Sequence, residues 1–154
     1  MTGETRSLAL VLERIVRNAM AQFRDISDAD LNRPLELPES NTALALATHL
    51  IGAAEYWVLQ LAGGQDVQRE RSAEFRATGT GAELVARYER WLTAMRQLFQ
   101  TLPEDRLEQP ARKFNGEPIT VRDALLHTVE HAALHQGHLE LTRQLLGYPP
   151  AGEQ

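Results

Sequence analysis

Four histidines recur at one-turn spacing near the C-terminal end of the sequence, namely His127, His131, His135 and His138, and the fifth, His49, lies far upstream. Because an α-helix turns about 100° per residue, the four fall within roughly 80° of one helix face. Imidazoles packed side by side cannot all be protonated, since like charges repel and burial disfavours the charged form. A divalent metal removes this conflict, because neutral imidazole is a common ligand of transition metals. The pattern therefore predicts a metal site.

Small and apolar residues share the histidine face, and polar residues occupy the opposite side of the same predicted helix. The histidine face also carries Ala124, Leu134, Leu141 and Leu145, whereas Arg122, Glu140, Arg143 and Gln144 point away from it. An amphipathic helix buries its apolar stripe in a bundle. We therefore expect the imidazoles to lie inside the molecule.

A third ligand is expected from His49, in a second apolar helical segment. Small or weakly polar side chains share its helix face, including Ala45, Ala53 and Tyr56, and they leave room for an ion. Two histidines at positions i and i+4 of one helix can reach the same ion. Spacing alone does not decide whether His49 is joined by residues 131 and 135 or by residues 127 and 131.

Four helices should position these residues. Apolar periodicity, caps and helix breakers place the helices at about 4–25, 41–62, 80–102 and 120–146. Ser40 or Asn41 is the expected cap of the second helix, and capping boxes open the third and fourth at Thr80 and Thr120. The connections are 27–39 with a short helical turn, a long polar segment 65–79, and 103–119 with a brief extended turn. This organisation predicts an all-α four-helix bundle.

Composition sets the remaining bounds. The 154 residues, 43% hydrophobic and 24% charged, fit one domain over 1–154. The absence of cysteine excludes thiolate ligands and disulfides and favours the cytoplasm, and no signal peptide is recognisable. A net charge of -5 with scattered arginines argues against a nucleic-acid partner. The apolar run 43–62 is interrupted by His49, Glu55 and Gln60, which argues against a membrane span.

The sequence resembles the DinB-like, or YfiT-like, superfamily of bacterial metal-binding four-helix bundles. The resemblance is carried by His49-Leu50 on the second helix and by the run Leu126-His127-Thr-Val-Glu-His131-Ala-Ala-Leu-His135-Gln-Gly-His138 on the last. It implies a divalent metal, zinc or nickel before iron or manganese, held by His49, His131 and His135. It also implies a small-molecule substrate, a low-molecular-weight thiol as cosubstrate and a homodimer.

The chain departs from the family pattern after its last expected ligand. Relatives commonly continue as Arg-Gly-Gln, whereas His135 is followed by Gln136-Gly137-His138. The additional imidazole of His138 could support a ligand, accept a proton or bind the ion itself.

Three neutral ligands leave a divalent ion its full charge and an open position, which favours activation of a thiol or of water. The first hypothesis is an enzyme that transfers a small thiol to an electrophile, with Tyr56, His127 or His138 moving the proton. A metal-dependent hydrolase is the nearest variant, although no carboxylate shares the histidine face of the last helix. A non-catalytic bundle, either a metal-binding stress protein or a dimerising scaffold, is the alternative from another class.

Overall fold

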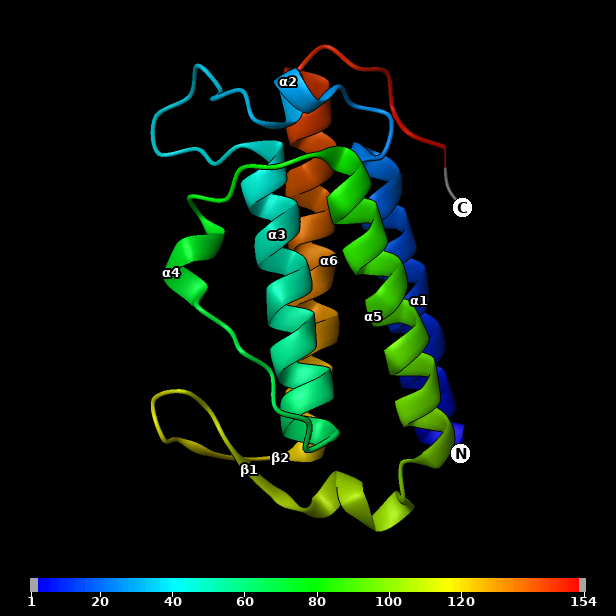
Figure 1. Cartoon of the computed structure of the whole chain (residues 1–154). Coiled ribbons are helices and arrows are strands. Elements are labelled where there is room, and N and C mark those ends of the chain that lie inside the picture. Colours follow the sequence, from blue (N-terminus) through cyan, green and yellow to red (C-terminus); the bar gives the residue numbers. More distant parts are fainter. Residues whose placement is uncertain (1–2, 153–154) are drawn as a thin grey trace.

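A computed structural model describes residues 3–152, and it shows a bundle of four long helices (Figure 1). The long helices are α1 (Gly3–Phe23), α3 (Ala43–Ala54) extended by η1 (Glu55–Ala62), α5 (Gly81–Thr101) and α6 (Val121–Leu145). The short elements are α2 (Asp28–Leu31), α4 (Arg71–Glu74), η2 (Glu104–Glu108), β1 (Pro110–Arg112) and β2 (Pro118–Thr120). The all-α prediction is confirmed. Residues 1–2 and 153–154 of the predicted domain lie outside the described range.

The direction of the helices explains the long second connection, 65–79. The helices α1 and α6 run one way along the bundle, and α3 and α5 run the other way (Figure 1). Because α3 and α5 are parallel, the chain must return along the whole bundle between them. The segment 65–79 makes this return beside α3 and carries the short helix α4 at mid-height (Figure 1). The polar connection is therefore placed next to the helix that carries His49.

The predicted capping boxes set the starts of α5 and α6. Thr80 accepts a hydrogen bond from the backbone N–H of Glu83, and Thr120 accepts one from that of Asp123. Each acidic side chain in turn accepts from the backbone N–H of its threonine, which satisfies two otherwise unpaired donors. The second helix is capped by Thr42, one residue beyond the predicted Asn41. Helix ends are thus set locally by side chains that the sequence reveals.

The second long helix changes its winding at Glu55. Residues 55–62 form a π-helix, whose wider turns shift each side chain relative to a regular α-helix. Tyr56 and Trp57 are both buried there and form a small second core with Ala53 and Ala124 of α6. The hairpin of β1 and β2, in which Ala111 pairs with Ile119, adds Ile119 to this cluster.

Large side chains from all four helices fill the main core. The largest fully buried members are Trp91, Tyr88, Phe23, Phe99, Leu12, Met20, Leu31, Leu50, Ile51, Leu92, Met95 and Leu107. The hydroxyl of Tyr88 donates to the carbonyl oxygen of Ala47 at 2.7 Å, which fixes α5 against α3 two residues before His49. Burial raises the pKa of Tyr88, so this phenol stays protonated.

The prediction of the buried face of α6 was partly wrong. Leu134, Leu141 and Leu145 are exposed by more than half, while Arg143, predicted to point outward, is only 2% exposed. The helix turns its core face mainly towards α1, where Arg143 donates to the carbonyl oxygen of Gln22 at 3.0 Å. The histidine stripe therefore lies at the margin of the core, between α6 and α3.

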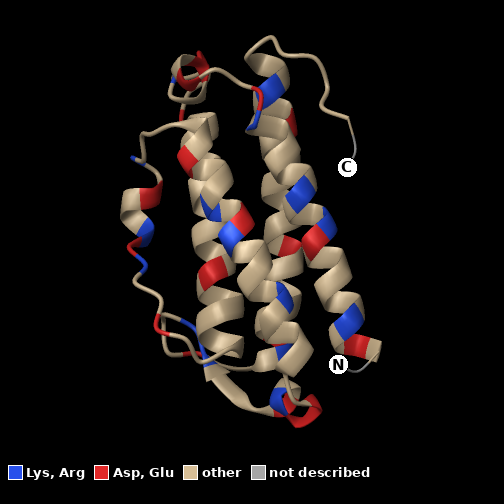
Figure 2. Cartoon of the chain, turned by 45° about the vertical axis from the view of Figure 1, so that its right-hand side comes forward, with Lys and Arg blue, Asp and Glu red and all other residues tan. Residues whose placement is uncertain are grey.

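Charges of both signs are interspersed along the helices (Figure 2). Several ion pairs join neighbouring helices, such as Glu13 of α1 with Arg96 of α5 and Glu55 of η1 with Arg87 of α5. Within residues 3–152, no helix has both the length and the apolar character that a membrane span requires.

Candidate metal centre

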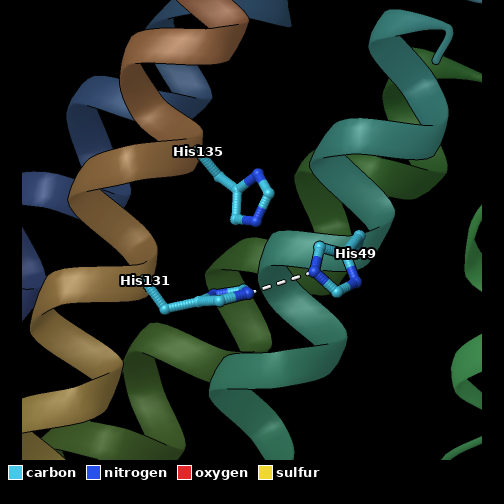
Figure 3. Close-up of side chains that lie close together, drawn as sticks. All are labelled: His49, His131 and His135. Atoms are coloured by element: carbon cyan, nitrogen blue, oxygen red, sulfur yellow. Dashed lines mark hydrogen bonds between the residues drawn. The ribbon is translucent and has the colours of Figure 1, made fainter. Parts of the chain in front are cut away.

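The structure brings three of the five histidines together, one from α3 and two from α6 (Figure 3). Each of His49, His131 and His135 can offer one ring nitrogen such that the three atoms lie within 4.8 Å of one another. His131 and His135 are four residues apart, so successive turns of α6 direct their rings towards α3. His49 meets them from the opposite helix, with 3.0 Å between its Nε2 and that of His131.

The surroundings favour neutral imidazole on α6. Burial, followed by the neighbouring His135, lowers the pKa of His131 to about 3. Burial, followed by His49 and then His138, lowers the pKa of His135 to about 4. Both rings therefore carry a lone pair at neutral pH, which is the form that binds a metal.

A carboxylate outside the long helices sets the tautomer of His49. Glu74 of α4 accepts a hydrogen bond from His49 Nδ1 at 2.7 Å, so the proton of the neutral ring lies on Nδ1 and its Nε2 has a lone pair. Arg69 donates to both carboxylate oxygens of Glu74, at 2.6 and 2.9 Å. Burial alone would raise the pKa of Glu74, but the hydrogen bonds from His49 and Arg69 outweigh it and lower that pKa.

Sequence reasoning missed Glu74 and Arg69. Both lie in a polar connection without periodicity, and only the return of the chain along α3 brings them to His49. Phe75 was missed too, and its ring centroid lies 4.6 Å from that of His49. One local signal was available: the glycine at position 52, one turn beyond His49, makes room on α3 for the Glu74 carboxylate.

The three remaining candidates surround the cluster in different ways. His127 packs on Trp57 with ring centroids 4.5 Å apart, and its ring lies 5.8 Å from that of His131. His138 is exposed, and its Nδ1 lies 3.3 Å from Nδ1 of His135. Tyr56 stacks on Phe114 of the hairpin at 4.0 Å. Burial raises the pKa of Tyr56, so its phenol stays protonated at neutral pH and is available as a proton donor.

The three clustered histidines fit a divalent transition metal. Two nitrogens bound to one zinc ion stand about 3.3 Å apart in tetrahedral geometry and never more than about 4.2 Å. The Nε2 atoms of His49 and His131 stand 3.0 Å apart, and one ring nitrogen from each of the three histidines lies within 4.8 Å of the others, which is close to this range. No ligand in the set carries charge, which leaves the charge of an ion undiminished.

The sequence model of the mycothiol S-transferase family matches residues 7–147 of this chain, which is nearly the whole bundle. The chain belongs to the mycothiol S-transferase family. This places it in the DinB-like superfamily and confirms the predicted resemblance. No match was found among proteins of curated function.

Two solved structures share the fold of this mycothiol S-transferase family member. A conserved protein from Enterococcus faecalis superposes with a TM-score of 0.73 at 15% sequence identity, covering 95% of this chain and 98% of that one. A mutant of mycothiol-dependent maleylpyruvate isomerase superposes with a TM-score of 0.64 at 14% identity. That alignment covers 88% of this chain and 60% of the isomerase, so the isomerase has a substantial part without counterpart here.

Proposed function

We propose that this protein is a metal-dependent thiol S-transferase that joins mycothiol, or a closely related low-molecular-weight thiol, to a small electrophile. The observation that carries the proposal is the convergence of His49, His131 and His135 in a chain of the mycothiol S-transferase family. Nitrogen ligands favour zinc or nickel over iron or manganese. A homodimer stays a prediction from the family resemblance.

The proposed reaction transfers sulfur to carbon. The thiol loses its proton, a sulfur–carbon bond forms, and the bond from carbon to the leaving group breaks, so that the leaving group departs with one proton. When bound, a divalent ion held by three neutral imidazoles would lower the pKa of a thiol at its open position. His131 and His135 are half-buried at the margin of the bundle, which would leave the open position of such an ion accessible to a substrate.

His127 and His138 are the proposed proton acceptors. His127 is half-buried beside His131, and its ring packs at a tilt on Trp57 near the cluster. His138 is exposed at the other end of the stripe, so its ring can exchange protons with water. Tyr56, whose ring stacks on Phe114, remains a third candidate for moving the proton, as a donor.

The hydrolase alternative finds less support in the site. A metal-assisted hydrolase commonly uses a carboxylate as general base. Glu74 is a carboxylate next to the cluster, but its oxygens already accept hydrogen bonds from His49 and from Nε and Nη2 of Arg69. Metal analysis combined with a conjugation assay distinguishes the transferase from a non-catalytic metal-binding bundle.

Metal analysis of the purified protein tests the site. We expect one zinc or nickel ion per chain in the wild type and loss of stoichiometric metal in His49→Ala, His131→Ala and His135→Ala. The matched control is His127→Ala, which removes an imidazole of the same stripe and should keep the metal. Unchanged occupancy in all three ligand variants would refute the proposed site.

A conjugation assay tests the reaction. Mycothiol and glutathione are each offered with a general electrophile to the metal-loaded and the chelator-stripped protein. We expect turnover with mycothiol only when metal is present, and restoration when zinc is added back. Tight metal binding without turnover on either thiol would favour the non-catalytic bundle, and equal turnover after stripping would contradict a metal-dependent transferase.

A further inference from the structure

We propose that Glu74 is the positioning residue of His49, and that it couples metal binding at the three histidines to docking of the connection 65–79 on α3. This inference rests on the proposed metal site. It assigns a role to a residue outside the four long helices and to a segment that would otherwise only join α3 to α5.

The contact between Glu74 and His49 is buried on both sides. His49 is 4% exposed and Glu74 is 6% exposed, and the Nδ1 proton of His49 is donated to Glu74 Oε2 at 2.7 Å. The opposite nitrogen of the ring, Nε2, faces His131. A carboxylate on one nitrogen of an imidazole fixes both the ring orientation and the tautomer that leaves the other nitrogen free to bind a metal. Glu74 therefore holds His49 in its ligand form.

Arg69 compensates for the cost of burying the Glu74 carboxylate. An isolated carboxylate is strongly disfavoured away from water unless it is paired and hydrogen-bonded. The guanidinium of Arg69 faces Glu74 in a two-pronged arrangement, with Nε on one oxygen and Nη2 on the other. Arg69 and Glu74 both belong to the connection, so the pair can form within that segment. His49 then attaches the pair to the bundle.

Gly52 gives independent support for a site shaped around the carboxylate. A Cβ atom at position 52 would lie 2.9 Å from Glu74 Cδ and would overlap with its Oε1. Alanine in the interior of a helix is favoured over glycine by about 1 kcal/mol. The presence of glycine in the interior of α3 thus has a physical explanation. A residue without a side chain leaves the space that the Glu74 carboxylate needs to reach His49.

Docking of the connection also covers the imidazole. Phe75, the residue after Glu74, lies with its ring 4.6 Å from that of His49, and Arg71 lies with its Cζ 5.4 Å from the centre of the Phe75 ring. If metal binding needs His49 in the orientation that Glu74 sets, then metal binding must stabilise the docked connection by the same factor. The connection is expected to be more protected with metal than without it.

The first experiment measures zinc affinity by competition with a chromophoric chelator. We expect a 10- to 100-fold weaker affinity for Glu74→Ala, the range typical of an outer partner of a metal-binding histidine. Glu74→Gln keeps an acceptor without the charge and should lose less. Gly52→Ala displaces the carboxylate without changing any acid or ligand and should resemble Glu74→Ala. Glu70→Gln is the matched control, because this exposed acid hydrogen-bonds to Ser72 and should leave the affinity unchanged.

A second measurement reads the tautomer directly. Nitrogen-15 NMR of the metal-free protein should show the His49 proton on Nδ1 in the wild type and a substantial Nε2 form in Gly52→Ala and Glu74→Ala. This result does not depend on metal binding, so it separates a failure of the proposed metal site from a failure of the positioning role. Gly52→Ala keeps the test decisive if Glu74→Ala does not fold.

A third measurement monitors how well the connection 65–79 is protected from proteolysis. Trypsin can cleave after the exposed Arg71 and Arg76, and zinc should slow both cuts several-fold in the wild type but not in Glu74→Ala. The proposal is overturned if Glu74→Ala and Gly52→Ala bind zinc like the wild type, or if the His49 tautomer is unchanged in both. Equal cleavage with and without zinc in a wild type that binds zinc would overturn the coupling.

Discussion

The three imidazoles of the cluster differ in the side chains that they contact. His49 donates to the buried carboxylate of Glu74, whereas His135 lies against the exposed imidazole of His138. The ring of His131 packs among the other imidazoles of the cluster. A buried, charged hydrogen bond is stronger than one that water can replace, so the partners should contribute unequally to metal affinity. Glu74 should therefore matter more than His138.

The variant His138→Gln tests this order at the position where relatives commonly have glutamine. We expect zinc affinity to fall by less than about tenfold, because water can take the place of an exposed partner of His135. Competition with a chromophoric chelator measures the change, with His135→Ala as the reference for a lost ligand. A loss as large as that of His135→Ala would mean that His138 itself binds the metal.

The histidines of the cluster could be predicted from the sequence, but the residues that hydrogen-bond to them from outside the cluster could not. One-turn spacing is a local property, so the sequence places His131 and His135 on the same helix face before any packing is known. The choice of this pair over His127 and His131 required the family resemblance. Glu74 reaches the site through the return path of the connection, which is a property of the topology and leaves no periodic signal in the sequence.

At the scale of elements, the starts of α5 and α6 were predictable because neighbouring residues fix them, whereas the cap of α3 is Thr42 and not the predicted Ser40 or Asn41. The boxes at Thr80 and Thr120 set the starts of α5 and α6 as the sequence indicates. The orientation of α6 was not predictable in the same way. The buried Arg143 is inserted against α1, where Asp25 and the carbonyl oxygen of Gln22 satisfy its guanidinium, and only the packed structure reveals those partners.

The cap of α6 can be tested separately from the chemistry of the site. Thr120→Ala removes the acceptor for the Asp123 backbone N–H, which lies 3.1 Å from the threonine hydroxyl. We expect the free energy of unfolding to fall by about 1 kcal/mol, with metal content unchanged. The control is Thr93→Ala in the middle of α5, where the exposed hydroxyl donates only to the Glu89 carbonyl oxygen. Equal losses in urea denaturation of both variants would show that the cap has no special weight.

At the scale of the whole molecule, ion pairs connect α1 and the turn that follows it to α5 and α6. Glu13 accepts from Arg96 of α5 and from Arg17 on its own helix, and Asp25 accepts from Arg143 of α6. The hydrogen bond from Arg96 is the main cause that lowers the pKa of Glu13 to about 2, with burial opposing it and Arg17 adding to it. The bundle should therefore lose stability in acid partly through α1.

The variant Glu13→Gln isolates this contribution. A carboxylate whose pKa is lower in the folded than in the unfolded chain stabilises the fold above the unfolded value and loses that effect as the pH falls through the folded value. The side chains of Arg96 and Glu13 are 41% and 27% exposed, so solvent screening limits the effect to about 1 kcal/mol at pH 6. Urea denaturation of the chelator-stripped wild type and variant should show this difference at pH 6 and a shrinking one towards pH 2.

Glu36→Gln, at an exposed acid in the 27–39 connection, is the matched control and should match the wild type throughout. Since screening by salt weakens partly exposed ion pairs, the difference should also shrink in 1 M salt. A difference that stays constant from pH 6 to pH 2 would show that Glu13 acts through packing and not through its charge.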